Sequence, residues 1–151
     1  MTNKKNILIL LLIFLTSCGY KPIFSTSGSN VSINNIEFIK ESKLNNKFER
    51  RINVYKASET EKSYDLEIKI DQTKIISLKD SKGDPKIFLT EIKILINVIK
   101  NGKIIISEDF VESFSYNNNT NKFDLSRYEN NIENNMVNEL IEKIIIYLQT
   151  L

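Results

Sequence analysis

The 151-residue sequence contains no histidine, no tryptophan and a single cysteine, Cys18. The lack of histidine excludes imidazole general bases, Cys-His dyads, Ser-His-Asp triads and Cys/His zinc sites. A single cysteine also excludes any disulfide within the chain. Glycine (four) and proline (two) are scarce, while 41% of residues are hydrophobic and 26% are charged, which is typical of one folded domain.

Without histidine, an enzyme would have to use carboxylates, lysine, tyrosine or serine. Glu108 and Glu112 are the pair to examine first, because they are expected on one face of one strand. No motif surrounds them, and acids on strands are usually solvated. We therefore interpret them as surface charges and expect no enzymatic activity, no cofactor and no bound metal.

The first 17 residues have the features of an export signal. Lys4 and Lys5 provide positive charge, and nine unbroken apolar residues follow from Ile7 to Leu15. Nine helical residues span about 14 Å, whereas the hydrocarbon core of a bilayer is about 30 Å thick. We therefore predict that residues 1–17 are a cleaved signal peptide.

The segment Leu15-Thr16-Ser17-Cys18-Gly19 resembles the bacterial lipobox. The resemblance implies cleavage between Ser17 and Cys18 and lipidation of Cys18. The alternatives are an ordinary cleavage site beside an incidental cysteine, or an uncleaved anchor. Because two or more acyl chains anchor a protein stably, a lipidated mature chain would sit on a membrane surface.

Cleavage would also change the charge balance. Removing Lys4 and Lys5 lowers the number of Lys and Arg residues from 21 to 19, which equals the 19 Asp and Glu residues. A mature chain near neutrality lacks the clustered positive charge of nucleic-acid-binding domains, so we expect no nucleic-acid partner.

The mature chain is expected to be a lipidated tether, residues 18–30, followed by one domain, residues 31–151. A strand should begin near Val31 and contain a bulge at Asn34-Asn35, where the apolar parity changes. A short amphipathic helix should follow, because apolar residues then recur at helical spacing. They are Leu44, Phe48, Ile52 and Tyr55.

Three strands are expected next, at residues 64–78, 87–99 and 103–116. The first alternates apolar and charged residues with a period of two, and a turn-rich segment, 79–86, follows it. For the last hairpin, a two-residue turn at Asn101-Gly102 would set apolar residues opposite polar ones.

We therefore predict a three-residue loop, Lys100 to Gly102, in this hairpin. The pairs predicted from it are Val98 with Ile104, Ile96 with Ile106, Ile92 with Phe110, and Phe88 with Phe114.

The last helix is predicted to begin at Ser126, with Ser126 and Glu129 forming a capping box. Its apolar stripe consists of Tyr128, Ile132, Met136, Leu140, Ile141, Ile144, Ile145 and Leu148. The order β-α-β-β-β-α predicts an α+β fold, a two-layer sandwich with a four-stranded sheet and two amphipathic helices on one face. The other sheet face carries Asp65, Glu67, Lys69, Glu91 and Lys93, and should be solvated or meet a partner.

Five lysines in the expected turns could contact phosphates of an anionic lipid. They are Lys79, Lys82, Lys86, Lys100 and Lys103. Hairpin geometry puts the first three and the last two at opposite ends of the third strand, so we expect separate patches. The alternative is that these lysines only keep loops and strand edges soluble.

The chain is similar to the LPS-assembly lipoprotein family (LptE). The similarity begins at Cys18-Gly19-Tyr20-Lys21-Pro22-Ile23-Phe24 and continues as the same order of elements. The strand ending Phe114-Ser115-Tyr116, the Asn-containing loop, Phe123 and the capped final helix also resemble the C-terminal half of the family.

This resemblance implies a palmitate-bearing lipoprotein on the periplasmic side of the outer membrane, since Gly19 follows the lipidated cysteine. It implies that the domain plugs a large β-barrel that delivers lipopolysaccharide to the cell surface and supports its assembly. Lipopolysaccharide contact by the five lysines is the associated hypothesis. A periplasmic scaffold lipoprotein with another envelope partner and a lipid-active hydrolase remain as alternatives.

Overall fold

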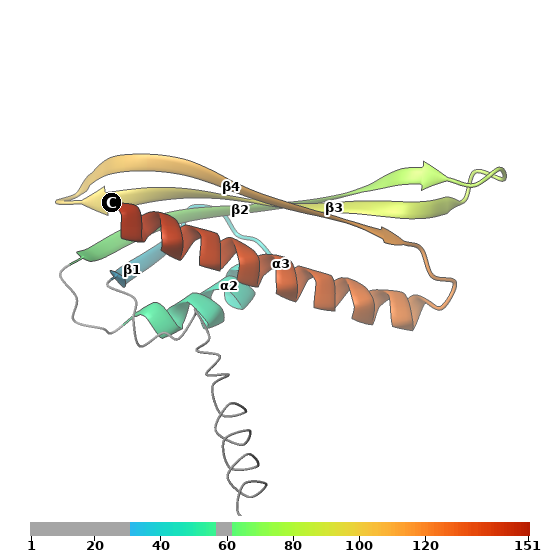
Figure 1. Ribbon diagram of the computed structural model, residues 1–151, viewed down its shortest axis with the longest axis horizontal. Helices are drawn as coiled ribbons and strands as arrows, with labels where there is room; N and C mark the ends of the chain where they lie inside the picture. Colours follow the sequence, from blue (N-terminus) through green and yellow to red (C-terminus); the bar gives the residue numbers. More distant parts are fainter. Residues whose placement is uncertain (1–30, 57–61) are drawn as a thin grey trace, which may run out of the picture.

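Four strands form a single sheet in the order β1-β2-β3-β4, and two helices lie on one side of it (Figure 1). The computed structural model describes residues 31–56 and 62–151. The elements are β1 (Val31–Phe38), α2 (Asn45–Ile52), the 3-10 turn η2 (Asn53–Tyr55), β2 (Lys62–Lys79), β3 (Pro85–Lys100), β4 (Lys103–Asn117) and α3 (Lys122–Thr150). The predicted α+β sandwich is thereby confirmed. The predicted signal peptide and tether lie outside the described residues.

The sheet is mixed, because β1 pairs with β2 in parallel while the other two pairs are antiparallel. A parallel pair needs a crossover connection, and α2 lies within it. The register of β1 shifts between Ile33 and Asn35, which confirms the predicted bulge. The bulge lets Ile33 and Ile36 both pair with inward-facing residues of β2 despite their different parity.

Helix α2 buries the apolar stripe that its sequence predicts. Phe48 and Ile52 are fully buried, as is Leu44 just before the first turn. Phe48 packs edge-on against Phe38 of β1, with ring centroids 6.3 Å apart. Tyr55 belongs to η2 and is partly buried. These contacts hold the crossover against the sheet.

The turn of the β3–β4 hairpin differs from our prediction. Lys100 pairs with Lys103, so the turn has the two residues Asn101 and Gly102, whose φ angles of 53° and 70° are those of a type I′ turn. A bulge then shifts the register between Val98 and Ile99. This bulge restores the match of apolar faces that a uniform two-residue register would lose.

The predicted hairpin pairs are therefore wrong by two residues. Val98 faces Ile106 and Ile94 faces Phe110 in the structure. A two-residue error keeps every side chain on the predicted face, since the side-chain period of a strand is two. Glu108 and Glu112 lie opposite Ile96 and Ile92, which is tolerated because β4 is an edge strand with largely exposed side chains. All four predicted residue pairs are thus wrong, but each side chain lies on the predicted face of the sheet.

Helix α3 begins four residues before the predicted start. Asn121 is its N-cap, and its side-chain oxygen accepts hydrogen bonds from the backbone N–H groups of Phe123 and Asp124. The predicted capping box of Ser126 and Glu129 is therefore wrong. Asn caps helices as well as Ser does, and here Asn121 Nδ2 also donates to the Asp124 carboxylate at 2.8 Å.

The apolar stripe of α3 forms most of the helical side of the core. All the predicted positions from Ile132 to Leu148 are buried, and Leu125 and Val137 join them. Tyr128 is an exception, with 48% of its surface exposed. The charged face of the sheet is on the opposite side, where Lys93 and Asp109 form an ion pair at 2.8 Å. Among the described residues, no helix combines the length and apolarity needed to cross a bilayer.

Candidate functional site

The end of the sheet formed by the β2–β3 hairpin extends beyond the cover of β1 and α2 (Figure 1). We call residues 72–91 the distal arm. Strand β1 pairs only with residues Lys62 to Ile68 of β2. Every residue of β2 from 72 to 79 is exposed, although the strand alternates between buried and partly buried residues from 64 to 71. Within the described residues, the edge of β2 along the arm has no neighbouring strand.

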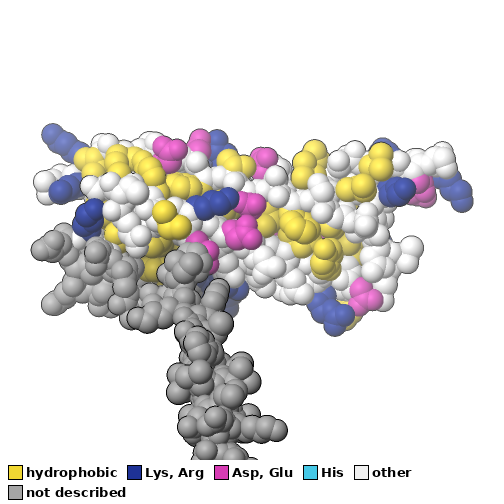
Figure 2. All heavy atoms as spheres, in the orientation of Figure 1, with side chains coloured by type: hydrophobic (Ala, Val, Ile, Leu, Met, Phe, Trp, Pro, Cys, Tyr) yellow, Lys and Arg dark blue, Asp and Glu magenta, His cyan; other side chains and the backbone are white. Residues whose placement is uncertain are grey.

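Apolar side chains are exposed on both faces of the arm. Ile75 and Leu78 pair with Leu89 and Ile87 on the face away from the helices, whereas Ile76 pairs with Phe88 on the helix side. Ile75, Ile76 and Leu78 are 55%, 45% and 46% exposed. Figure 2 shows apolar side chains at the surface towards both ends of the sheet, with acidic side chains near the middle. Such clustered apolar exposure marks protein or membrane interaction sites.

The turn at the tip of the arm presents three of the predicted lysines. Asp80 Oδ1 accepts hydrogen bonds from the backbone N–H groups of Lys82 and Asp84, both at 2.9 Å. Gly83 has a φ of 87°, which favours glycine. Lys79, Lys82 and Lys86 are exposed, and no carboxylate within the described chain pairs with them. The turn is thus ordered while its ammonium groups stay available to a ligand.

Lys100 and Lys103 flank the other hairpin turn, at the opposite end of β3 (Figure 1). Both are exposed. The structure therefore separates the five predicted lysines into two patches and does not bring them together. Cys18 and Ser17, the predicted lipidation and cleavage residues, lie outside the described residues.

A polar network joins α3 to the inner face of the arm. Lys74 Nζ lies 2.5 Å from Glu129 Oε1, and the Tyr116 hydroxyl donates to the same oxygen at 2.8 Å. The Lys74 ammonium also lies 4.3 Å from the ring centroid of Phe88. Burial, followed by the hydrogen bond to Glu129, raises the pKa of Tyr116 far above its usual value. This network is built to hold the helix in place, since each polar group has a partner.

A second ion pair connects α2 to α3. Lys47 Nζ contacts Glu133 Oε2 at 2.9 Å, and Gln72 Nε2 donates to Glu133 Oε1 at 2.8 Å. Burial would raise the pKa of Glu133, but these two hydrogen bonds, together with the positive charges of Lys47 and Lys43, outweigh it and lower the pKa. Glu133 therefore stays ionised as a structural anion.

The carboxylates that an enzyme hypothesis would use are separated. Glu112 forms an ion pair with Lys143 of α3, while Glu108 is exposed four residues away on the same strand. The described part of the chain has no group of acidic, cysteine or histidine side chains able to hold a metal ion. Nothing in this arrangement positions a nucleophile beside a base.

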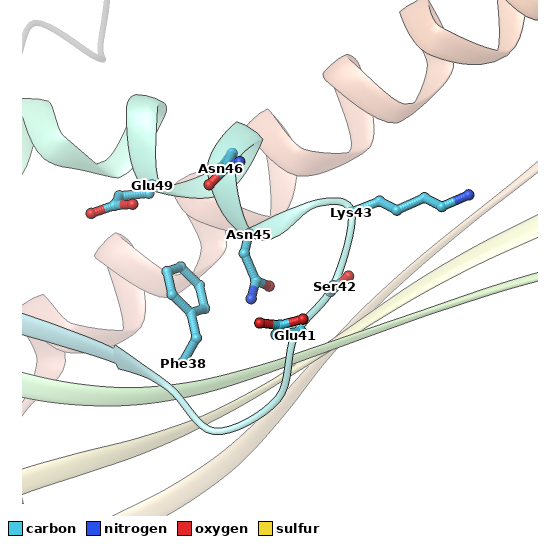
Figure 3. A pocket seen from close by; sticks show the side chains of 7 residues that line it. All are labelled: Phe38, Glu41, Ser42, Lys43, Asn45, Asn46 and Glu49. Carbon is cyan, nitrogen blue, oxygen red and sulfur yellow. The ribbon is translucent and has the colours of Figure 1, made fainter.

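An open hollow lies where the chain leaves β1 and enters α2 (Figure 3). Its volume is about 600 Å³, and its lining residues are Phe38, Glu41, Ser42, Lys43, Asn45, Asn46 and Glu49. Asn45 Nδ2 donates to the Lys40 carbonyl at 2.9 Å, and Lys43 extends away from the other side chains. The Asn45 contact ties the β1–α2 loop together, so we assign this hollow a structural role.

Sequence analysis missed the two features that stand out in the structure. The apolar surface of the arm could have been found from the loss of alternation after Asp71, where Lys74-Ile75-Ile76 breaks the period of two. The basic side of α2 could have been found from three closely spaced cationic residues, Lys47, Arg50 and Arg51. Its neighbours on α3 are 80 or more residues away in sequence and could not be found from local patterns.

Comparison with known proteins connects this fold to lipoproteins. Rare lipoprotein B from Shewanella oneidensis superposes with a TM-score of 0.57 at 12% identity, covering 78% of this chain and 95% of that one. A minor lipoprotein from Acinetobacter baumannii gives 0.56 at 14% identity, covering 79% and 91%. Lipoprotein B from Nitrosomonas europaea gives 0.55 at 12%, covering 78% and 83%.

These chains share the fold of this protein over most of their length. No protein-family model and no curated protein sequence matches the chain.

Proposed function

We propose that the protein is a lipid-anchored lipoprotein of the outer membrane that plugs the β-barrel of lipopolysaccharide transport and supports its assembly. The observation that carries this proposal is the fold shared with three lipoproteins, each over most of its length. The lipobox-like segment ending at Cys18 points to the same class independently.

The distal arm gives the proposal a docking surface. Exposed clusters of apolar side chains mark protein-interaction sites, and Ile75, Ile76 and Leu78 form such a cluster on both faces of one hairpin. Lys79, Lys82 and Lys86 at the tip would face anionic groups of lipopolysaccharide. A non-enzymatic role agrees with the ion-paired and separated carboxylates Glu112 and Glu108.

The first experiment is mass spectrometry of the mature protein, which should find acyl chains on an N-terminal Cys18. A bare cysteine, or a protein free in solution after cell fractionation, would reject the lipoprotein class. A Cys18→Ser variant should be released from membranes.

The second experiment is affinity purification from detergent-solubilised envelopes. The wild-type protein should bring down one large β-barrel, and depletion of the protein should lower both assembled barrel and surface lipopolysaccharide. The double variant Ile75→Asp/Leu78→Asp should lose the barrel. Ile39→Asp/Val54→Asp is the matched control, because these residues are similarly exposed, at 53% and 60%, but lie outside the arm.

A periplasmic scaffold lipoprotein is the alternative function. It would share the lipid anchor and the fold but co-purify with a different envelope protein. Normal amounts of barrel and surface lipopolysaccharide after depletion would favour it over the plug.

A further inference from the structure

A crevice with a basic lining lies between α2 and α3. Its volume is about 420 Å³. The residues that line it are Lys47, Arg50 and Arg51 of α2 and Asn130 and Asn134 of α3. Three are cationic and two are amides, and no carboxylate or apolar residue is among them. We propose that this crevice binds a phosphate group carried by a larger molecule.

Lys47 forms a fixed wall of the crevice. Its side chain is 15% exposed, and its ammonium group contacts Glu133 Oε2 and Asn130 Oδ1, both at 2.9 Å. Because the ion pair with Glu133 neutralises the charge of Lys47, this residue contributes to the crevice mainly through the fixed position of its side chain. Because Asn130 Oδ1 accepts from Lys47, the Nδ2 group of Asn130 remains as a donor.

Arg50 and Arg51 supply the net positive charge. Arg50 Nε donates to the backbone carbonyl of Asn46 at 3.2 Å, and Arg51 Nη1 donates to Asn138 Oδ1. Both acceptors are neutral, and neither guanidinium has a carboxylate partner within the described chain. A guanidinium has five N–H donors, so most donors of both arginines are unused by these contacts.

The unused groups match a phosphate better than other anions. Guanidinium donors form a planar fork that binds two phosphate oxygens at once, and a phosphate monoester offers three acceptor oxygens and close to two negative charges. The two contacts to Asn46 and Asn138 fix the arginine side chains, which lowers the entropy lost on binding. The crevice is larger than one phosphate, so it leaves room for the attached glycerol or sugar.

This site goes beyond the proposed function, because it belongs to the two helices and shares no residue with the arm or the hairpin lysines. The phosphate could belong to a lipid headgroup or to a soluble phosphorylated compound. Both sources present the same group to Arg50 and Arg51, so the experiment has to separate them.

The test is isothermal titration of the full-length mature protein in an uncharged detergent. The three probes are inorganic phosphate, glycerol 3-phosphate and dihexanoylphosphatidic acid. We expect binding that the double variant Arg50→Gln/Arg51→Gln weakens by at least about tenfold, since charged hydrogen bonds are lost. Tighter binding of the acylated probe assigns the site to a lipid headgroup, and equal binding of all three assigns it to soluble phosphates.

The matched control is Lys82→Gln/Lys86→Gln, which removes the same charge from the tip of the arm. It should change the dissociation constant less than twofold. Equal weakening by the two double variants would overturn the proposal, because it would show attraction by overall charge only. Absence of binding by all three probes to a folded wild-type protein would overturn it as well. All four arginine and lysine side chains are exposed, so thermal melting should show both variants folded.

Discussion

The two ends of the β-sheet differ in what covers them. At one end, which we call the core half, β1, α2 and α3 bury the inward side chains of β2 from Tyr64 to Ile70 and of β3 from Ile92 to Val98. At the other end, the distal arm leaves Ile75 and Ile76 exposed on opposite faces. The same strands run through both halves. The difference in side-chain exposure therefore comes from the elements packed against each half and not from strand geometry.

This contrast indicates that one half of the sheet provides stability while the other half is available for binding. Apolar area removed from water provides most of the folding free energy, so the core half should hold the structure together. Exposed apolar side chains contribute little to folding and remain available to a partner. Substitutions in the core half should therefore change stability more than substitutions in the distal arm.

The largest effect is expected from Phe48→Ala in the core half. Phe48 is fully buried and joins α2 to β1 through its contact with Phe38. Removing a buried ring should lower the free energy of unfolding by about 3–5 kcal/mol. Urea denaturation of wild-type and variant proteins measures this change. A loss below about 1 kcal/mol, which is closer to the effect of a surface substitution, would show that α2 is not part of the cooperative core.

The junction between the two halves is the network of Tyr116, Glu129 and Lys74. Tyr116→Phe should lower the free energy of unfolding by about 1–2 kcal/mol at neutral pH, because a hydrogen bond to a charged group is lost while Lys74 still pairs with Glu129. The measurement is again urea denaturation. Tyr128→Phe is the control, since its ring also contacts Tyr116 but its side chain is half exposed.

The raised pKa of Tyr116 predicts that the free energy of unfolding depends on pH in the alkaline range. Since the pKa of Tyr116 is raised in the folded state, the folded protein keeps this proton when the unfolded chain loses it. The stabilisation from Tyr116 is therefore complete below about pH 10, the ordinary tyrosine pKa, and falls as the pH rises above it. Stability curves of wild-type and Tyr116→Phe proteins should converge above that pH. Parallel curves would contradict the buried hydrogen bond.

Much of the core half could be predicted from sequence because its signals are local. The period-two alternation of β2 predicted which of its side chains are buried. The apolar spacing on α2 did the same for Leu44, Phe48 and Ile52. The β3–β4 register failed because a bulge after Val98 compensates the two-residue turn, and no composition rule marks that position. The side chains kept their faces because the error was even-numbered.

The candidate sites were harder to predict for a different reason. The phosphate-binding crevice needs α2 to lie against residues 130–138 of α3, a contact that depends on the whole fold. The exposure of Ile75 depends on β1 ending after seven paired residues of β2, and an apolar strand residue is buried or exposed according to its neighbours. The lysine turns were found because charged turn residues are exposed in almost any fold.

A smaller effect is expected at the start of α3, beside the arm. Asn121→Ala removes the side-chain oxygen that accepts from two backbone N–H groups, and should lower the free energy of unfolding by about 1 kcal/mol. Ser126→Ala is the control, because Ser126 lies inside the helix and is exposed. Thermal denaturation compares the two. If Ser126→Ala cost more than Asn121→Ala, the helix would begin at the later position that the sequence pattern favoured.

The smallest effect is expected from Ile75→Thr in the distal arm, and Ile70→Thr on the same strand is its counterpart in the core half. Ile70 is 1% exposed and Ile75 is 55% exposed, so the same change of side chain is made in a buried and in an exposed setting. Ile70→Thr should cost about 2–3 kcal/mol, since it leaves a hydroxyl among apolar side chains, whereas Ile75→Thr should stay within about 0.5 kcal/mol. Urea denaturation measures both changes. Equal losses would mean that the arm is covered in solution, and the assignment of Ile75 to a docking surface would then fail.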